Sequence, residues 1–154
     1  MASAPRPTLL ERMRGPNARP IDLLVERGTA SAAHIARHYQ GFARARVEEI
    51  ARRLATLSGG APDAEWQRFC DMVQDLRSSS ATCGDETVSW VSGSWEKALD
   101  PQFRGEPRLM AVMQLHLDAL RLAVSENAGG AELRALAGQL ESVVKSLTPA
   151  GGTA

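Results

Sequence analysis

Apolar residues recur at steps of three and four along most of this chain, the spacing that places side chains on one face of an α-helix. Short runs rich in glycine and proline interrupt the pattern near residues 58–62, 84, 100–107 and 127–130. The pattern therefore predicts an all-α protein with five amphipathic helices. The first begins at Thr29 or Ser31, either of which can cap a helix, and a shorter helix over residues 21–27 precedes it and ends at Gly28.

Each predicted helix has a set of residues that we expect to face the core. In the first helix the set is Ile35, Tyr39, Phe42, Ile50, Leu54 and Leu57. In the second, which Asp63 is expected to cap, the set is Trp66, Phe69, Val73, Leu76 and Ser80. The third helix carries Val88, Val91, Trp95 and Leu99, and the fourth Leu109, Met113, His116, Leu117, Leu120 and Val124. The fifth carries Leu133, Leu136, Leu140, Val143, Val144 and Leu147.

The connections between these helices are short, which favours neighbours that run antiparallel. We therefore expect an antiparallel four-helix bundle over residues 21–147, built by the central long helices, with the short helix added at its N-terminal end. Residues 1–20 contain four prolines and are expected to form a flexible leader. Residues 148–154 are mostly small and are expected to form a disordered tail.

Length and composition fit a single domain of 154 residues that buries its own core. No apolar run approaches the ~20 residues that cross a bilayer. Residues 1–19 also lack the apolar stretch of a secretory signal, so we expect a cytoplasmic protein without a membrane partner. In that compartment Cys70 and Cys83 are expected to be reduced packing residues, and no metal or cofactor is expected.

The net charge is zero, but basic and acidic side chains are unevenly distributed. Residues 1–53 contain ten arginines and five acids, whereas the remainder contains eight basic and thirteen acidic side chains. Such asymmetry can mark a nucleic-acid surface. Half of these arginines lie in the leader or at its edge without interleaved aromatic residues, which favours a solvated helix face. Binding of nucleic acid or of a protein partner through residues 6–53 is kept as an alternative.

The second helix has an outward face of polar and small residues. If Val73 and Leu76 point into the core, Gln74 lies about 100° round the helix from Val73 and points outward. A basic side chain one turn beyond it can neutralise a phosphate or pair with a carboxylate of another protein. The small side chains on this face leave room for the loops of a partner. We call this candidate docking surface the Gln74 face, and it consists of Gln67, Asp71, Gln74, Arg77 and Ser78.

Residues 74–84 resemble the phosphoacceptor segment of histidine phosphotransfer (HPt) domains, which reads His-x-Leu-Lys-Gly-Ser-Ser-Ala-x-x-Gly. The match runs without a gap through Leu76, Arg77, Ser79, Ser80, Ala81 and Gly84. More loosely, the helices over residues 30–147 are similar to those of bacterial HPt proteins. The resemblance implies a four-helix bundle that shuttles phosphoryl groups between receiver domains and has no cofactor of its own.

One departure from the HPt pattern changes the expected chemistry. Gln74 stands where the family has its acceptor histidine, and a glutamine has no nucleophilic lone pair at neutral pH. By the same resemblance, Arg77 takes the place of the phosphate-stabilising lysine and Ser78 that of a glycine that makes space. We therefore expect a pseudo-HPt protein, not an enzyme, that binds a response-regulator receiver domain or a histidine kinase. It would modulate a bacterial two-component phosphorelay without carrying phosphate.

Other histidines define an alternative, which is active phosphotransfer through His34 or His38 on the first long helix. Their spacing also suits a metal, but no carboxylate or cysteine lies within a turn of them. His116 falls on an apolar face and is expected to be a hydrogen-bonded, partly buried residue. A homodimer through the alanine-rich side of the first long helix is a further alternative. The sequence shows no phosphate-binding glycine loop, no di-iron Glu-x-x-His pair and no Cys–His arrangement.

Overall fold

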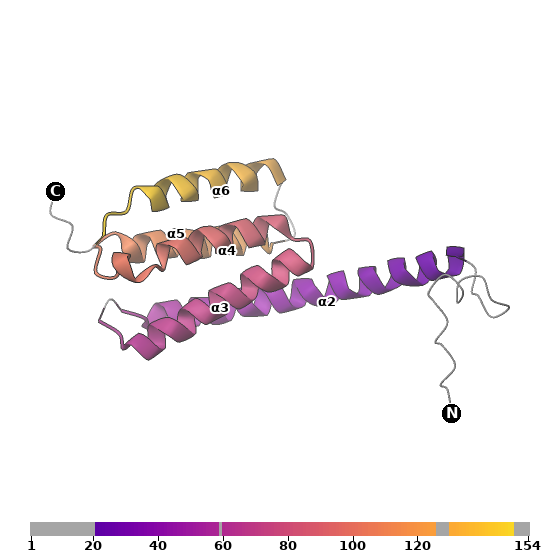
Figure 1. Ribbon diagram of the computed structural model, residues 1–154, viewed down its shortest axis with the longest axis horizontal. Helices are drawn as coiled ribbons and strands as arrows, with labels where there is room; N and C mark the ends of the chain where they lie inside the picture. Colours follow the sequence, from indigo (N-terminus) through magenta and orange to yellow (C-terminus); the bar gives the residue numbers. More distant parts are fainter. Residues whose placement is uncertain (1–20, 59, 126–129, 150–154) are drawn as a thin grey trace, which may run out of the picture. The chain divides into compact units, whose positions relative to one another are not determined.

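The computed structural model of the chain describes residues 21–58, 60–125 and 130–149 (Figure 1). These residues form five α-helices and one 3-10 turn, and no strand occurs among them. The helices are α2 (Ile21–Thr56), α3 (Asp63–Thr82), α4 (Glu86–Ala98), α5 (Leu109–Ala123) and α6 (Gly130–Lys145), and the 3-10 turn is η1 (Pro101–Phe103). The all-α prediction is confirmed for this part of the chain. The predicted leader over residues 1–20 and the end of the predicted tail lie outside the described residues.

Helix α2 is longer than predicted, because it begins at Ile21 and continues through Gly28. The predicted helix end at Gly28 is therefore wrong. A single glycine inside a helix costs only about 1 kcal/mol relative to alanine, and no other helix-breaking residue adjoins it.

Contacts divide the chain into two units, residues 1–37 and residues 38–154. In the first unit, every side chain from residue 23 to residue 37 is exposed.

In the second unit, α2 buries a line of residues at steps of four and three: Tyr39, Ala43, Val47, Ile50 and Leu54, followed by Leu57 after the helix ends. Ile35 and Phe42 were predicted to lie in the core, but they are 56% and 40% exposed. The prediction failed because it counted large apolar residues and passed over Ala43 and Val47, which hold the inward positions.

The core faces predicted for the other helices are confirmed almost throughout. On α3, all five predicted residues are buried, and Met72 joins them. Val124, Leu136 and Val143 are only partly buried but pack against the same core. The largest fully buried side chains are Trp66, Trp95 and Phe69.

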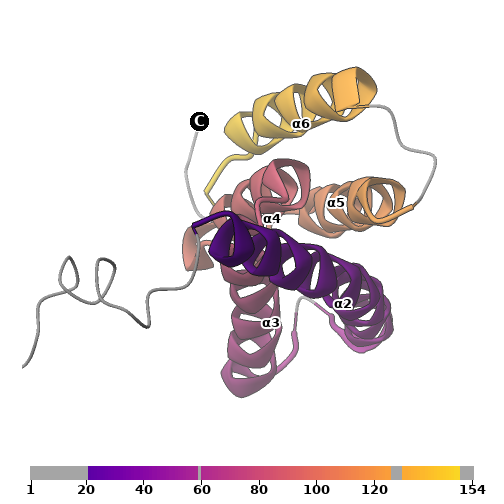
Figure 2. The same ribbon diagram turned by 90° about the vertical axis from the view of Figure 1, so that its right-hand side faces the viewer.

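Helix α4 has the central place among α3–α6. It packs against α3, α5 and α6, and α5 also packs against α6. Figures 1 and 2 show α4 lying between α3 and α6 in both views. Residues 38–56 of α2 add their buried line to the same core. The side chain of Arg121 on α5 donates two hydrogen bonds to Glu48 on α2, of 3.1 and 3.2 Å.

Local chemistry explains the start of α4 and the turn before it, but not the predicted start of α3. Asp85 caps α4, because its carboxylate accepts a hydrogen bond of 3.1 Å from the Val88 amide. Gly84 ends the preceding turn with a φ of 77°, a conformation that favours glycine. Asp63 does not cap α3 as predicted: Pro62 occupies the N-cap position, and Asp63 pairs with Arg104.

A buried carboxylate joins the start of α5 to the end of α6. Glu106 is 8% exposed and accepts hydrogen bonds from the backbone and side chain of Arg108. It also accepts from the amide and hydroxyl of Thr148, at 3.0 and 3.1 Å. Thr148, the first residue of the predicted tail, is therefore bound. Within the described residues, no helix is both long and apolar enough to cross a membrane.

Candidate functional site

The Gln74 face lies on the solvent side of α3. Gln67, Asp71, Gln74 and Ser78 follow one another at steps of four, three and four residues, and all are exposed. Because a helix turns by 100° per residue, this stripe lies opposite the buried face that contains Leu76. The structure thus brings the four predicted residues onto one surface.

The side chains on this stripe differ in whether they form hydrogen bonds within the protein. Gln67 donates a hydrogen bond of 2.8 Å from Nε2 to Oδ1 of Asp71, one turn along the helix. Among the described residues, the side chain of Gln74 has no hydrogen-bond partner and projects into solvent. Its amide therefore offers both a donor and an acceptor to an incoming protein.

Arg77 lies at the edge of the stripe that faces α4, and its guanidinium forms an ion pair with Glu96 on that helix. The side chains of Arg77 and Glu96 are 52% and 24% exposed. The Arg77 side chain passes over Gly93, where a Cβ would lie 3.4 Å from its Nε atom, at ordinary contact distance. Sequence reasoning missed Glu96 and Gly93. Arg77 is held on α4 in the free protein, while its expected role towards phosphate stays a prediction.

Two of the three serines after Arg77 donate their hydroxyl hydrogen bonds to backbone carbonyls of α3. The hydroxyl of Ser79 donates to the Asp75 carbonyl at 2.7 Å, and that of Ser80 to the Arg77 carbonyl at 2.9 Å. Such bonds to the preceding turn occupy the hydroxyl proton. Ser78 is exposed, and its carbonyl accepts a hydrogen bond of 2.9 Å from Thr82. Small side chains thus surround the end of the Gln74 face without forming a nucleophilic centre.

On its other edge, the Gln74 face borders α2. Arg46 of α2 bonds Glu49 at 3.1 Å and approaches Asp75 of α3 at 3.9 Å. Its guanidinium also lies 5.6 Å from the centre of the Phe42 ring, within the range of a cation–π contact. Phe42 is therefore an exposed apolar residue beside the face, which the sequence had placed in the core.

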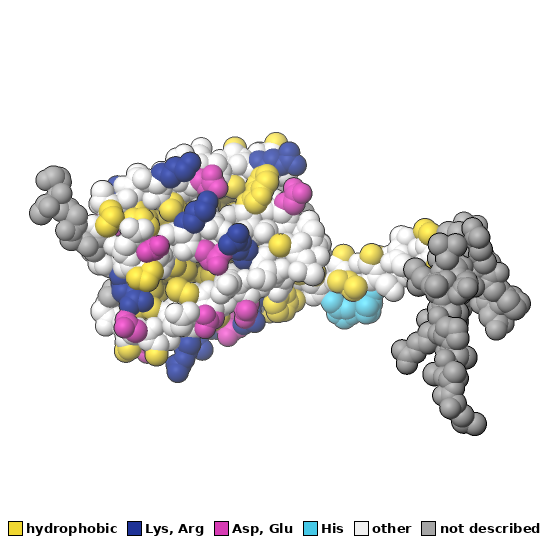
Figure 3. Space-filling view, in the orientation of Figure 1, with side chains coloured by type: hydrophobic (Ala, Val, Ile, Leu, Met, Phe, Trp, Pro, Cys, Tyr) yellow, Lys and Arg dark blue, Asp and Glu magenta, His cyan; other side chains and the backbone are white. Residues whose placement is uncertain are grey.

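Arg44 and Arg46, both in the basic N-terminal third, contact other residues of the same protein at its surface. Arg46 is paired as described, and Arg44 donates from Nε to the carbonyl of Val124 at 3.0 Å. Figure 3 shows Lys and Arg side chains interspersed with Asp and Glu over α3, α4 and α6, on the side facing the viewer. The alternative of binding nucleic acid or a protein partner through residues 6–53 concerns another part of the chain, so this mixed surface does not test it and it stays a prediction.

The histidines occupy two kinds of environment. His116 is fully buried: Nδ1 donates to the Val112 carbonyl at 2.7 Å, so Nε2 accepts from the Ser94 hydroxyl at 2.9 Å. Burial lowers the pKa of His116, which favours the neutral ring. The predicted hydrogen bonding is confirmed, and the burial is complete where partial burial was predicted. His34 and His38 are exposed on α2, and phosphotransfer through either stays a prediction.

Cys70 and Cys83 are free thiols, the first half-buried and the second exposed. Burial raises the pKa of the Cys70 thiol, which keeps it protonated and unreactive. Within the part of the chain that the structure describes, no group of three or more His, Cys, Asp or Glu residues could hold a metal ion.

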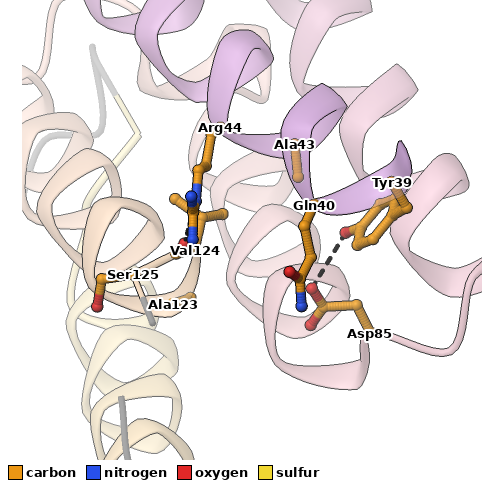
Figure 4. A pocket seen from close by; sticks show the side chains of 8 residues that line it. All are labelled: Tyr39, Gln40, Ala43, Arg44, Asp85, Ala123, Val124 and Ser125. Carbon is orange, nitrogen blue, oxygen red and sulfur yellow. Dashed lines mark hydrogen bonds between the residues drawn. The ribbon is translucent and has the colours of Figure 1, made fainter. Parts of the chain in front are cut away.

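A separate hollow of about 210 Å³ opens between α2, the start of α4 and the end of α5 (Figure 4). Tyr39 donates from its hydroxyl to Oδ2 of Asp85 at 3.1 Å across it, while the other carboxylate oxygen caps α4. Burial and the neighbouring Asp85 raise the pKa of Tyr39 above its ordinary value. The hydrogen bond between Tyr39 and Asp85, together with the cap of α4, gives these two side chains a structural role. Its lining residues are Tyr39, Gln40, Ala43, Arg44, Asp85, Ala123, Val124 and Ser125.

In comparisons with known proteins, no family model, curated protein or solved structure matches the chain.

Proposed function

We propose that this protein is a pseudo-HPt protein with an antiparallel four-helix bundle, and that it binds a response-regulator receiver domain or a histidine kinase. The observation that carries the proposal is the position of Gln74. It is exposed at the middle of a polar stripe on α3, in a segment that resembles a phosphoacceptor helix. In this proposal the protein regulates a bacterial two-component phosphorelay in the cytoplasm.

Binding without transfer follows from the chemistry of the glutamine side chain. Phosphoryl transfer to an HPt-like protein needs a nitrogen lone pair that attacks phosphorus. The lone pair of an amide nitrogen is delocalised into its carbonyl, so Gln74 can only exchange hydrogen bonds with the partner. A receiver docked on this face is withheld from its own kinase or phosphotransferase, and the protein acts by competition.

The Arg77–Glu96 ion pair lets Arg77 change partner when another protein binds the Gln74 face. Arg77 is 52% exposed, and ion pairs at the surface contribute about 0–1 kcal/mol, so an anionic partner can take the place of the half-buried Glu96 at little cost. In the free protein the pair keeps Arg77 against α4 and leaves Gln74 and Ser78 uncovered. A partner that carries an aspartate or aspartyl phosphate then gains a charge-assisted hydrogen bond from Arg77.

The test is an NMR titration of the labelled full chain with isolated receiver domains from the same organism. We expect saturable shifts of the Gln74, Arg77 and Ser78 amides with one receiver. Gln74→Trp and Ser78→Trp block close approach and abolish those shifts without unfolding the protein.

A matched control is available on α5, where Gln114 bonds Asp118 one turn away, as Gln67 bonds Asp71 on α3. Gln114→Trp adds the same bulk to an exposed helix surface elsewhere, and binding should be retained. If both Trp variants on α3 bind like the unchanged protein, or if no receiver shifts these amides, the proposed function is wrong.

A further inference from the structure

A second surface, independent of the Gln74 face, lies in the groove between α4 and α6. Its feature is Trp90, which is 50% exposed, whereas Trp66 and Trp95 are 1% and 0% exposed. A half-exposed tryptophan beside an open groove is the kind of residue that concentrates binding energy at protein interfaces. The groove is lined by Trp90, Arg134, Ala137, Gly138 and Glu141.

The size of the groove points to a protein side chain as its occupant. Its volume is about 260 Å³. Pockets for small-molecule ligands usually enclose ≈ 300–1,000 Å³ and bury most of the ligand. This groove is smaller and lies open on the surface, so it suits one or two side chains that another protein chain presents.

Gly138 keeps the groove open without a packing reason inside the protomer. A Cβ at Gly138 would meet no atom within 4 Å. Glycine inside a helix is less favourable than alanine, and Gly138 lies in the middle of α6. The space above Gly138 is therefore available to a side chain from outside.

The charges beside the groove would complement those of the same groove on a second copy of the chain. Arg134 and Glu141 lie two turns apart on α6, one on each side of Gly138. Glu141 is 3.7 Å from Lys97 in an exposed pair, whereas Arg134 has no ion-pair partner among the described residues. A second α6 laid antiparallel across Gly138 places each Arg134 opposite the Glu141 of the other copy.

We propose that two copies of this chain associate through the α4–α6 groove, about a two-fold axis that runs between the two α6 helices, perpendicular to them and level with Ala137 and Gly138. The two Trp90 side chains meet beside the axis and fill the paired grooves, as offset or edge-to-face aromatic rings do. Two Arg134–Glu141 ion pairs flank them. The arrangement is isologous, because the same patch serves both partners, and so it closes at the dimer.

The dimer is expected to be weak. α6 has 16 residues and is therefore about 24 Å long, so the patch is at or below the lower end of specific interfaces. The pairs are exposed at its rim, so added salt weakens the association. Sedimentation equilibrium of the full chain, from micromolar to millimolar concentration, should show a reversible monomer–dimer transition.

Two variants separate this surface from others. Trp90→Ala should raise the dissociation constant by about tenfold or more, the effect of removing a central aromatic side chain. Leu122→Ala is the control: Leu122 is 45% exposed on α5, outside the groove, and its removal should leave the dissociation constant unchanged.

The charge swap provides the decisive measurement. Arg134→Glu and Glu141→Arg each bring like charges together and should weaken the dimer, whereas the double variant restores both pairs and the dimer. A protein that stays monomeric to millimolar concentration overturns the proposal. A dimer that is insensitive to Trp90→Ala, or whose single charge variants are not rescued by the double variant, overturns it equally.

Discussion

Under the proposed function, Gln74 is the side chain that prevents the exposed face of α3 from accepting a phosphoryl group. Gln74→His places an imidazole at this exposed position, with Asp71 and Ser78 unchanged beside it. Its nitrogen can attack the phosphorus of a receiver's aspartyl phosphate; the aspartate carboxylate leaves, and the histidine keeps the phosphoryl group. We expect acid-labile label on Gln74→His after incubation with a phosphorylated receiver, and none on the unchanged protein. Gln114→His, on α5, should stay unlabelled; a Gln74→His variant that also stays unlabelled contradicts this prediction.

Two tryptophans on α4 give a matched test of what stabilises the protein. Trp95 is fully buried, with its ring 5.5 Å from that of Phe69 and 5.7 Å from that of His116. Trp95→Ala should lower the free energy of unfolding by about 3–5 kcal/mol, because it removes apolar contacts and leaves a cavity. Trp90→Ala, at a half-exposed site, should cost less than about 1 kcal/mol. Urea denaturation at low protein concentration measures both, and equal losses would refute this account of the core.

For the candidate site, helix periodicity in the sequence predicts which side chains of α3 point outward, but not which residues of other helices they contact. Val73 and Leu76 point inward and Gln74 outward, because each residue's direction follows from its place in the helical turn. Glu96 could not be found in this way, because it lies nineteen residues from Arg77 on another helix. Contacts between helices depend on how two elements are packed, which one sequence does not specify.

At the scale of elements, α2 shows which sequence signals mislead. Gly28 was interpreted as a helix end because glycine often follows one, yet the helix passes through it. Gly84 does end its turn, and it has a φ of 77°. The two glycines look alike in sequence and differ in backbone conformation. The predicted interruptions near residues 84 and 100–107 do bound α4, because Asp85 caps its start and Pro101 begins the 3-10 turn that follows it.

This difference between Gly28 and Gly84 can be measured. Gly28→Ala should make the free energy of forming α2 more favourable by about 1 kcal/mol, because a Cβ there meets nothing within 4 Å and alanine favours a helix over glycine. Gly84→Ala should lower the free energy of unfolding by roughly 1–2 kcal/mol, because a positive φ is strained for alanine. Amide hydrogen exchange over residues 23–32 reports the first effect, and urea denaturation the second. Opposite signs are expected, and equal signs would contradict the assigned backbone conformations.

At the scale of the whole molecule, the sequence predicted the all-α class and most inward positions, but not the central place of α4. That arrangement depends on which faces meet, and small residues such as Ser92 and Ser94, both buried on α4, carry no obvious apolar signal. Glu106 falls in the interruption of the helical pattern near residues 100–107, where the pattern predicts no buried residue. Its burial appears only when the chain after α6 returns to the start of α5 and brings Thr148 to it.

Glu106 therefore links the stability of the fold to pH. Hydrogen bonds from Arg108, then from the Thr148 and Arg108 amides, lower its pKa to about 2, whereas an unfolded glutamate has a pKa of about 4.3. Because the folded state binds this proton less readily, the stabilisation is complete above about pH 5 and is lost as the pH falls towards 2. Glu106→Gln should accordingly be less stable than the unchanged protein at pH 7, and the difference should shrink as the pH falls from 5 to 2.

Urea denaturation of both proteins at pH 7, 4 and 2.5 measures that difference directly. Glu132→Gln is the control, because Glu132 is exposed on α6 and forms no ion pair with any described residue. Its difference from the unchanged protein should stay small at every pH. If the Glu106→Gln difference were as large at pH 2.5 as at pH 7, the carboxylate would not be the group that binds Arg108 and Thr148, and the junction of α5 and α6 would need another explanation.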